Sequence, residues 1–99
     1  MPLMQSGELP APPAHIHIMG VCGTAMGALA GMLVDAGYRV TGSDHGIYPP
    51  MSDYLASIGV EVMEGFRAAH LDARPNLVVV GNVIRAEYEE AVALRERDL

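Results

Sequence analysis

Residues 15–27 read HIHIMGVCGTAMG, and this segment decides the fold. Its first five residues are suited to a short strand, and GVCG at 20–23 then supplies a tight turn. Thr24 can cap the helix that follows, because its hydroxyl oxygen can accept a hydrogen bond from a free backbone amide of the first turn. We expect this helix to run to about Ala36, with Gly37 in the left-handed conformation that often ends helices. A strand, a glycine turn and a helix in this order begin a βαβ unit.

The rest of the chain continues this alternation. We expect strands at 38–41, 60–63 and 76–80, a helix opened by Pro49-Pro50 and ended by Gly59, and a final helix at 87–97. Such βαβ units have right-handed crossovers and make a parallel sheet, which puts the fourth strand beside the first. The sequence therefore predicts a Rossmann-like, doubly wound α/β fold with strand order 3-2-1-4 and three αβα layers.

The apolar pattern also predicts which side chains face inward. The strand at 76–80 should be covered on both faces, because its NLVVV run is unbroken. The acidic residues near the end, Glu87, Glu89, Glu90 and Glu96, should form a solvated helix face. Inward-facing helix residues are expected at Met26, Leu29, Ala30, Met32, Leu33, Tyr54, Leu55, Ile58, Tyr88, Ala91, Val92 and Leu94.

Composition excludes several function classes. The 99 residues suffice for one domain, and 51% of them are hydrophobic, which fits a packed core. The net charge is −6 and the chain has no lysine, which argues against binding to nucleic acid. Without lysine the chain also lacks a GxxxxGK[ST] phosphate loop and a Schiff-base nucleophile. A single cysteine excludes an internal disulfide and is compatible with the cytoplasm, where we expect the protein.

The chain divides into a leader and one domain. Residues 1–14 are rich in proline and are expected to form a flexible leader. Residues 15–99 should form the domain, which we expect to be a fragment of a longer protein. The uncharged run at 18–34 is too short for a membrane span and is interrupted by glycines, so no membrane partner is predicted.

A ligand crevice is predicted at the carboxyl ends of the strands. In open α/β sheets, ligands bind there, and this places residues 20–27, 42–48 and 81–85 around one crevice. Backbone amides at the start of the first helix favour a diphosphate, and a side chain at Gly20 or Gly23 would block its approach. Asp44 follows the second strand, where acidic residues often contact the ribose or base of a nucleoside. His45, the next residue, could stack on or hydrogen-bond the same nucleoside.

Two other hypotheses remain open at this point. The domain could bind NAD(P) as the Rossmann module of an oxidoreductase, although Cys22 and Ala25 replace two glycines of the G-x-G-x-x-G fingerprint. It could also be a partner-binding module without enzymatic function, in which the glycine turn serves packing or lies in an interface.

Four motifs together are more specific than any one of them. GVCGTAMG at 20–27, GSD at 42–44, IYPPMS at 47–52 and Gly81-Asn82 resemble the N-terminal domain of the Mur ligases. The resemblance covers residues 15–85. The IYPPMS stretch is most similar to the family member that attaches a recycled tripeptide, rather than to the alanine-adding member. The family commonly has Asn-Pro after Arg85, whereas this chain reads Ala86-Glu87-Tyr88.

The resemblance implies an ATP-dependent carbon–nitrogen ligase in peptidoglycan recycling whose substrate is UDP-N-acetylmuramic acid. ATP and Mg²⁺ would lie on a central domain and the peptide on a C-terminal domain. This fragment would hold no cofactor or catalytic residue and would be inactive alone. Its partners would be UDP-N-acetylmuramic acid and the other two domains. The diphosphate cradle would be Gly20, Val21, Cys22, Gly23 and Thr24, the uridine contacts Ser43 and Asp44, and the far side of the site Asn82.

Cysteine and histidine receive simpler interpretations. Cys22 lies near a helix N-terminus, where thiol pKa values tend to fall, but the sequence places no base beside it. We therefore interpret Cys22 as a small loop residue. His15 and His17 share one face of their strand, but no third ligand is near, so no metal site is predicted and both should be partly in solvent. His70 has no assigned role.

Overall fold

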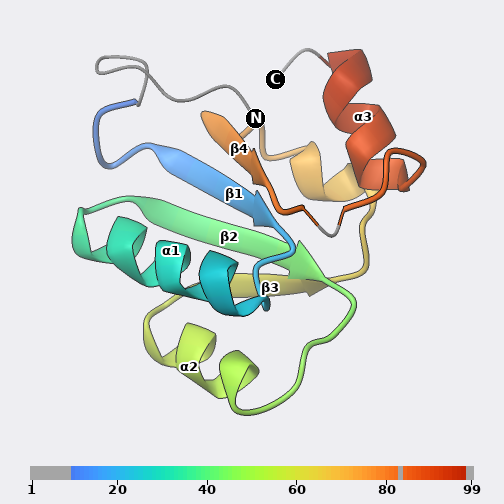
Figure 1. The fold of residues 1–99 in the computed structure, drawn as a ribbon. Helices are drawn as coiled ribbons and strands as arrows, with labels where there is room; N and C mark the ends of the chain where they lie inside the picture. Colours follow the sequence, from blue (N-terminus) through green and yellow to red (C-terminus); the bar gives the residue numbers. More distant parts are fainter. Residues whose placement is uncertain (1–9, 83, 98–99) are drawn as a thin grey trace.

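The computed structural model describes residues 10–82 and 84–97 and contains one parallel sheet (Figure 1). Its strands lie in the order β3-β2-β1-β4, which confirms the predicted order and fold class. The elements are β1 (His15–Met19), α1 (Thr24–Asp35), β2 (Arg39–Asp44), α2 (Met51–Ser57), β3 (Glu61–Glu64), the 3-10 helix η1 (Ala68–Leu71), β4 (Leu77–Val80) and α3 (Glu89–Arg97).

Helices cover both faces of the sheet. Helices α1 and α2 lie together on one face, and η1 and α3 lie on the other (Figure 1). Alternate residues of β1 therefore face different partners: Ile16 and Ile18 belong to the core under α1 and α2. Met19 belongs to a smaller apolar cluster with Phe66 and Ala91 on the other face.

Glycine turns end the elements as expected. Gly37 and Gly59 have φ values of 97° and 84°, so both adopt the left-handed conformation that ends a helix. Thr24 is not the cap of α1, because Gly23 occupies the N-cap position and no side chain bonds there. Strand β2 extends to Asp44, three residues beyond the predicted end, because Gly42 and Ser43 still pair with β1.

The burial predictions for Met32, Tyr54 and β4 were wrong. Met32 is 69% exposed, because it lies on the outer side of α1, and Tyr54 is 42% exposed. Strand β4 is not covered on both faces: Val80 is 42% exposed, and within the described sheet β4 pairs only with β1. Helix α3 begins at Glu89, two residues later than predicted, and it buries Glu90 together with Ala91 and Ala93.

Only residues 10–14 of the predicted leader lie within the described part of the chain. Residues 1–9 lie outside the described residues. Within 10–14, the Pro10 carbonyl accepts a hydrogen bond from the Tyr38 hydroxyl at 2.6 Å, and the Ala14 carbonyl accepts one from the Arg39 amide at 3.1 Å. In the described ranges, every helix is too short or too polar to traverse a lipid bilayer.

Candidate functional site

Backbone hydrogen bonds hold the glycine turn, residues 20–23, against the end of β2. The amides of Gly20 and Val21 both donate to the carbonyl oxygen of Ser43, at 2.8 and 3.2 Å. Gly20 has a φ of 86°, a conformation that residues with a Cβ rarely adopt. The Gly23 amide then donates to the Gly20 carbonyl at 3.2 Å and closes the turn. The turn is thus fixed to the neighbouring strand before α1 begins.

Val21 anchors this turn through packing. Its side chain is fully buried and covers the backbone of Gly42 in β2. A Cβ at Gly42 would lie 2.5 Å from the Cβ of Val21, which is far inside van der Waals contact. Of the predicted cradle residues, Val21 therefore offers only its backbone to the crevice.

Asp44 joins the glycine turn to the loop after β2. Its Oδ2 accepts a hydrogen bond from the Cys22 amide at 2.9 Å. Its Oδ1 accepts from the amides of His45 and Gly46, at 2.8 and 3.1 Å. The structure thus brings Cys22 and Asp44 together at the carboxyl edge of the sheet, with the carboxylate organising both loops.

The free amides at this turn begin at Thr24, the last residue of the predicted cradle. The N–H groups of residues 20–23 already have the protein acceptors described above. Helix α1 makes its first i to i−4 bond from Gly27 to Gly23, at 2.7 Å. The amides of Thr24, Ala25 and Met26 precede that bond and have no acceptor within the helix. The first turn of α1 has no acidic residue, so an anion would face the positive end of the helix without competition from a first-turn carboxylate.

Cys22 has no character of a nucleophile. Burial raises the pKa of its thiol, and the negative charges of Asp44 and Glu64 raise the pKa further. The fraction of thiolate at neutral pH is therefore lower than for a free cysteine. This supports the interpretation of Cys22 as a small loop residue.

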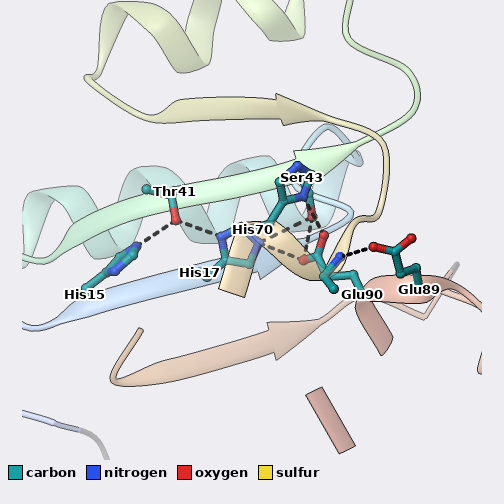
Figure 2. Close-up of polar contacts among 8 residues, drawn as sticks. His15, His17, Thr41, Ser43, His70, Glu89 and Glu90 are labelled. Atoms are coloured by element: carbon teal, nitrogen blue, oxygen red, sulfur yellow. Dashed lines mark hydrogen bonds and ion pairs between the residues drawn. The ribbon is translucent and has the colours of Figure 1, made fainter. Parts of the chain in front are cut away.

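The side chain of Ser43 lies inside the protein. Its side chain is fully buried, and its hydroxyl donates to Glu90 Oε2 at 3.0 Å, as Figure 2 shows. Position 43 alternates with Gly42 along β2, so its side chain faces η1 and α3. As placed here, the hydroxyl lies inside the protein and is not available to a uridine in the crevice.

A buried polar network surrounds Ser43 (Figure 2). Glu90 Oε2 bonds to His17 Nε2 at 2.8 Å, and Glu90 Oε1 bonds to His70 Nδ1 at 2.7 Å. Thr41 Oγ1 lies 2.7 Å from both His15 Nε2 and His17 Nδ1. The network therefore runs without a break from one end of β1 to helix α3.

The network overturns two sequence predictions. His15 and His17 are buried rather than partly in solvent, and Glu90 is fully buried rather than on a solvated face. The reason is that the sheet face under α3 and η1 is filled partly by polar groups that satisfy one another. The strict alternation of histidine and isoleucine in β1 was the available signal, because it marks one face as polar. Among the described residues, no group of three or more His, Cys, Asp or Glu is arranged to hold a metal ion.

Glu90 is stabilised as a carboxylate. Burial raises the pKa of its carboxyl, but hydrogen bonds from His17, His70 and Ser43 favour the charged form, and the net pKa is lowered. This balance agrees with a carboxylate that accepts three hydrogen bonds.

Aromatic rings pack around His45 in the loop after β2. The His45 ring meets Phe66 and Tyr88 edge-on, with centroids 4.6 and 5.6 Å apart. Phe66 and Tyr88 stack at 5.0 Å. Tyr88 lies in the loop directly before α3. Asn82 is exposed in the turn after β4.

His15 predicts a pH dependence of stability. Burial lowers its pKa below the ordinary value of 6.5, and the nearby Arg39 and His17 lower it further. The unfolded chain then binds the proton more readily, so the stability that the neutral ring provides is complete above pH 6.5 and is lost as pH falls below that value. We expect the urea midpoint to fall between pH 7 and pH 5, and to fall less in His15→Gln. An equal fall in both proteins would contradict this assignment.

Comparison with known proteins gives consistent matches. The family model described as "Mur ligase family, catalytic domain" matches residues 15–99. The UDP-N-acetylmuramate–L-alanyl-gamma-D-glutamyl-meso-2,6-diaminoheptandioate ligase of Haemophilus influenzae is 46% identical over 71 residues, which are 72% of this chain and 16% of that protein. Its Escherichia coli counterpart is 48% identical over 70 residues, which are 71% of this chain and 15% of that protein. The UDP-N-acetylmuramate–L-alanine ligase of Paraburkholderia phytofirmans is 36% identical over 83 residues, which are 84% of this chain and 17% of that protein.

Solved structures agree. The murein peptide ligase of Psychrobacter arcticus superposes with a TM-score of 0.84 at 46% identity, and the match covers 87% of this chain and 18% of that one. The chain thus spans less than a fifth of the curated relatives named here.

Proposed function

Because the chain belongs to the Mur ligase family, we propose that it binds the uridine diphosphate part of UDP-N-acetylmuramic acid within an ATP-dependent ligase. The ligase would join a recycled tripeptide to the muramic acid in the cytoplasm. Higher identity to the tripeptide-adding relatives, 46% and 48%, than to the alanine-adding relative, 36%, supports this choice of acceptor.

The free amides at the start of α1 carry the proposal. Among the described residues, the amides of Thr24, Ala25 and Met26 have no acceptor, and they follow the turn that Asp44 holds at the carboxyl edge of a parallel sheet. Gly23 before them is exposed, and a Cβ there would meet only the Gly20 carbonyl, at 3.4 Å. The diphosphate would therefore lie against the first turn of α1, with its close approach allowed by Gly23. Asp44, His45 and Asn82 would border the uridine.

ATP and Mg²⁺ are assigned to other domains of the ligase. This chain has no lysine for an ATP phosphate loop, and its described acidic side chains do not converge on a common point. The central domain would bind the ATP that phosphorylates the muramic carboxylate. The C-terminal domain would hold the peptide and its amine. The residues of this chain would hold and orient the nucleotide sugar.

Titration of the ¹⁵N-labelled chain with UDP-N-acetylmuramic acid tests the proposal. We expect saturable amide shifts at Thr24, Ala25, Met26 and Asp44, and none with NAD. Gly23→Ala should fold but bind about tenfold more weakly, which equals about 1.4 kcal/mol. Shifts with NAD alone would support the oxidoreductase hypothesis. Shifts with neither compound would contradict the proposal that this chain holds the nucleotide by itself.

A further inference from the structure

The Glu90 carboxylate joins four elements of the fold. Glu90 lies in the first turn of α3, and it bonds to His17 of β1, Ser43 of β2 and His70 of η1 (Figure 2). Its side chain is fully buried, so these contacts are not shared with solvent. The described residues leave no buried side-chain nitrogen or oxygen without a partner, so the network is complete as it stands.

Ser43 continues this network to the glycine turn. Its hydroxyl donates a hydrogen bond to Glu90, and its carbonyl oxygen accepts hydrogen bonds from the amides of Gly20 and Val21. One residue therefore lies between the α3 carboxylate and the backbone that leads into α1. Since Gly20 and Val21 have these bonds as their anchor, a shift of Ser43 would shift the turn.

We propose that Glu90 is a positioning residue for the nucleotide site. Through Ser43 it fixes the backbone of the glycine turn, and so the direction of the free amides of Thr24, Ala25 and Met26. The effect on ligand affinity rests on the proposed function, whereas the effect on the turn itself does not. A change at Glu90 in α3 should therefore alter the backbone of the glycine turn, although Glu90 lies on the opposite face of the sheet from α1.

Thr41 provides a matched control. Ser43 and Thr41 are both buried, both carry hydroxyls and lie two residues apart on the same face of β2. Thr41 bonds to His15 and His17 but not to Glu90. A general structural role for buried hydroxyls predicts similar effects of Ser43→Ala and Thr41→Ala, whereas positioning through Ser43 predicts an effect on the turn from Ser43→Ala alone.

Amide hydrogen exchange without ligand is the first measurement. The Asn76 amide, which donates to the His15 carbonyl at 2.8 Å, serves as the reference for overall opening. We expect exchange at Gly20 and Val21, relative to Asn76, to become about tenfold faster in Ser43→Ala, as for the loss of one hydrogen bond to a charged group. In Thr41→Ala the ratio should remain at the wild-type value. Equal ratios in the two variants would overturn the proposal.

The second measurement is the affinity for UDP-N-acetylmuramic acid. We expect Ser43→Ala to weaken binding about tenfold and Thr41→Ala to weaken it less than about twofold. Weaker binding by Ser43→Ala with unchanged exchange would indicate direct contact with the ligand and overturn positioning. Absence of binding by the wild-type chain would contradict the proposed function, and the exchange ratio would then decide the coupling alone.

A double-mutant cycle tests whether Glu90 acts through Ser43. In the Glu90→Ala background, Ser43→Ala should accelerate exchange at Gly20 and Val21 no further, because the link is already broken. Additive acceleration would contradict the coupling. If Glu90→Ala does not fold, the comparison of Ser43→Ala with Thr41→Ala decides the proposal.

Discussion

Gly42→Ala is expected to destabilise the folded chain by about 3 kcal/mol, because overpacking of a rigid site costs of this order. The new Cβ would lie 2.5 Å from Cβ and Cγ1 of Val21. Val21 cannot rotate its Cβ away, since that atom is fixed by a backbone bonded to the Ser43 carbonyl. Either β2 or the glycine turn must move. The urea midpoint measures the loss, with an unchanged slope as evidence that the transition remains two-state.

Two variants serve as controls for Gly42→Ala. Gly23→Ala meets only an ordinary contact of 3.4 Å and should cost no more than about 1 kcal/mol. Adding Val21→Ala to Gly42→Ala should restore part of the stability, because the crowding atoms at Cγ are removed. Wild-type stability of Gly42→Ala would mean that Val21 does not cover Gly42 in solution.

Glu90→Ala is expected to cost about 4 kcal/mol, because hydrogen bonds to a charged acceptor contribute roughly 1.5–3 kcal/mol each and their buried donors would be left without an acceptor. Three donors, on His17, Ser43 and His70, would lose their acceptor inside the protein. The neighbouring Glu89→Ala is the control: Glu89 is exposed and, among the described residues, accepts one hydrogen bond, from the Ala68 amide at 2.7 Å, so its loss should cost about 1 kcal/mol or less. Guanidinium denaturation of both variants measures the difference, and equal costs would contradict the role given to Glu90.

The difference between wild type and Glu90→Ala should shrink in acid. The folded pKa of Glu90 is below its ordinary value of 4.5, so its contribution is complete above that pH. The contribution is lost as pH falls through the lowered folded pKa. A difference that is constant down to strongly acid pH would show that the carboxylate charge is not what stabilises the network.

The fold could be predicted from the sequence because its signals are local. HIHIM followed by GVCG indicates a strand and a turn, and Gly37 and Gly59 mark helix ends through their positive φ. Alternation of strands and helices, with the rule of right-handed crossovers, then orders the sheet. The end of β2 was misplaced because Gly42 and Ser43 have low strand propensity alone, and their pairing with β1 decides the matter.

Glu90 could not be placed from the sequence. Its neighbours Glu87, Glu89 and Glu96 are exposed, and nothing local separates a buried acid from them. What buries Glu90 is a set of donors from β1, β2 and η1, of which His17 lies 73 residues earlier. Ser43 was assigned to the ligand for the same reason: its position at the crevice was visible, but not the acceptor behind it.

The candidate site was predicted in outline only. Glycines and an acidic residue at the right spacing predict a crevice, and in the structure the Cys22 amide donates a hydrogen bond to Asp44. Which amides remain free depends on acceptors elsewhere. The Ser43 carbonyl accepts hydrogen bonds from the amides of Gly20 and Val21, and the Asp44 carboxylate accepts one from Cys22. The available donors therefore begin at Thr24.

The central place of β1 also sets the order of events during synthesis. On the ribosome β1 emerges before the other strands of the described sheet, and its two neighbours follow at different times: Val40 pairs with Ile16 across 24 positions, and Leu77 pairs with Ile16 across 61. The half made of β1, α1 and β2 can assemble early, because its contacts close a short loop. The polar face of β1, with His15 and His17, is covered only after β4 and α3 have been synthesised, and Glu90 lies on α3. Because Glu90 lies on α3, which follows all strands of the described sheet in the sequence, we expect the hydrogen bonds of His17 and Ser43 to Glu90 to form late in folding.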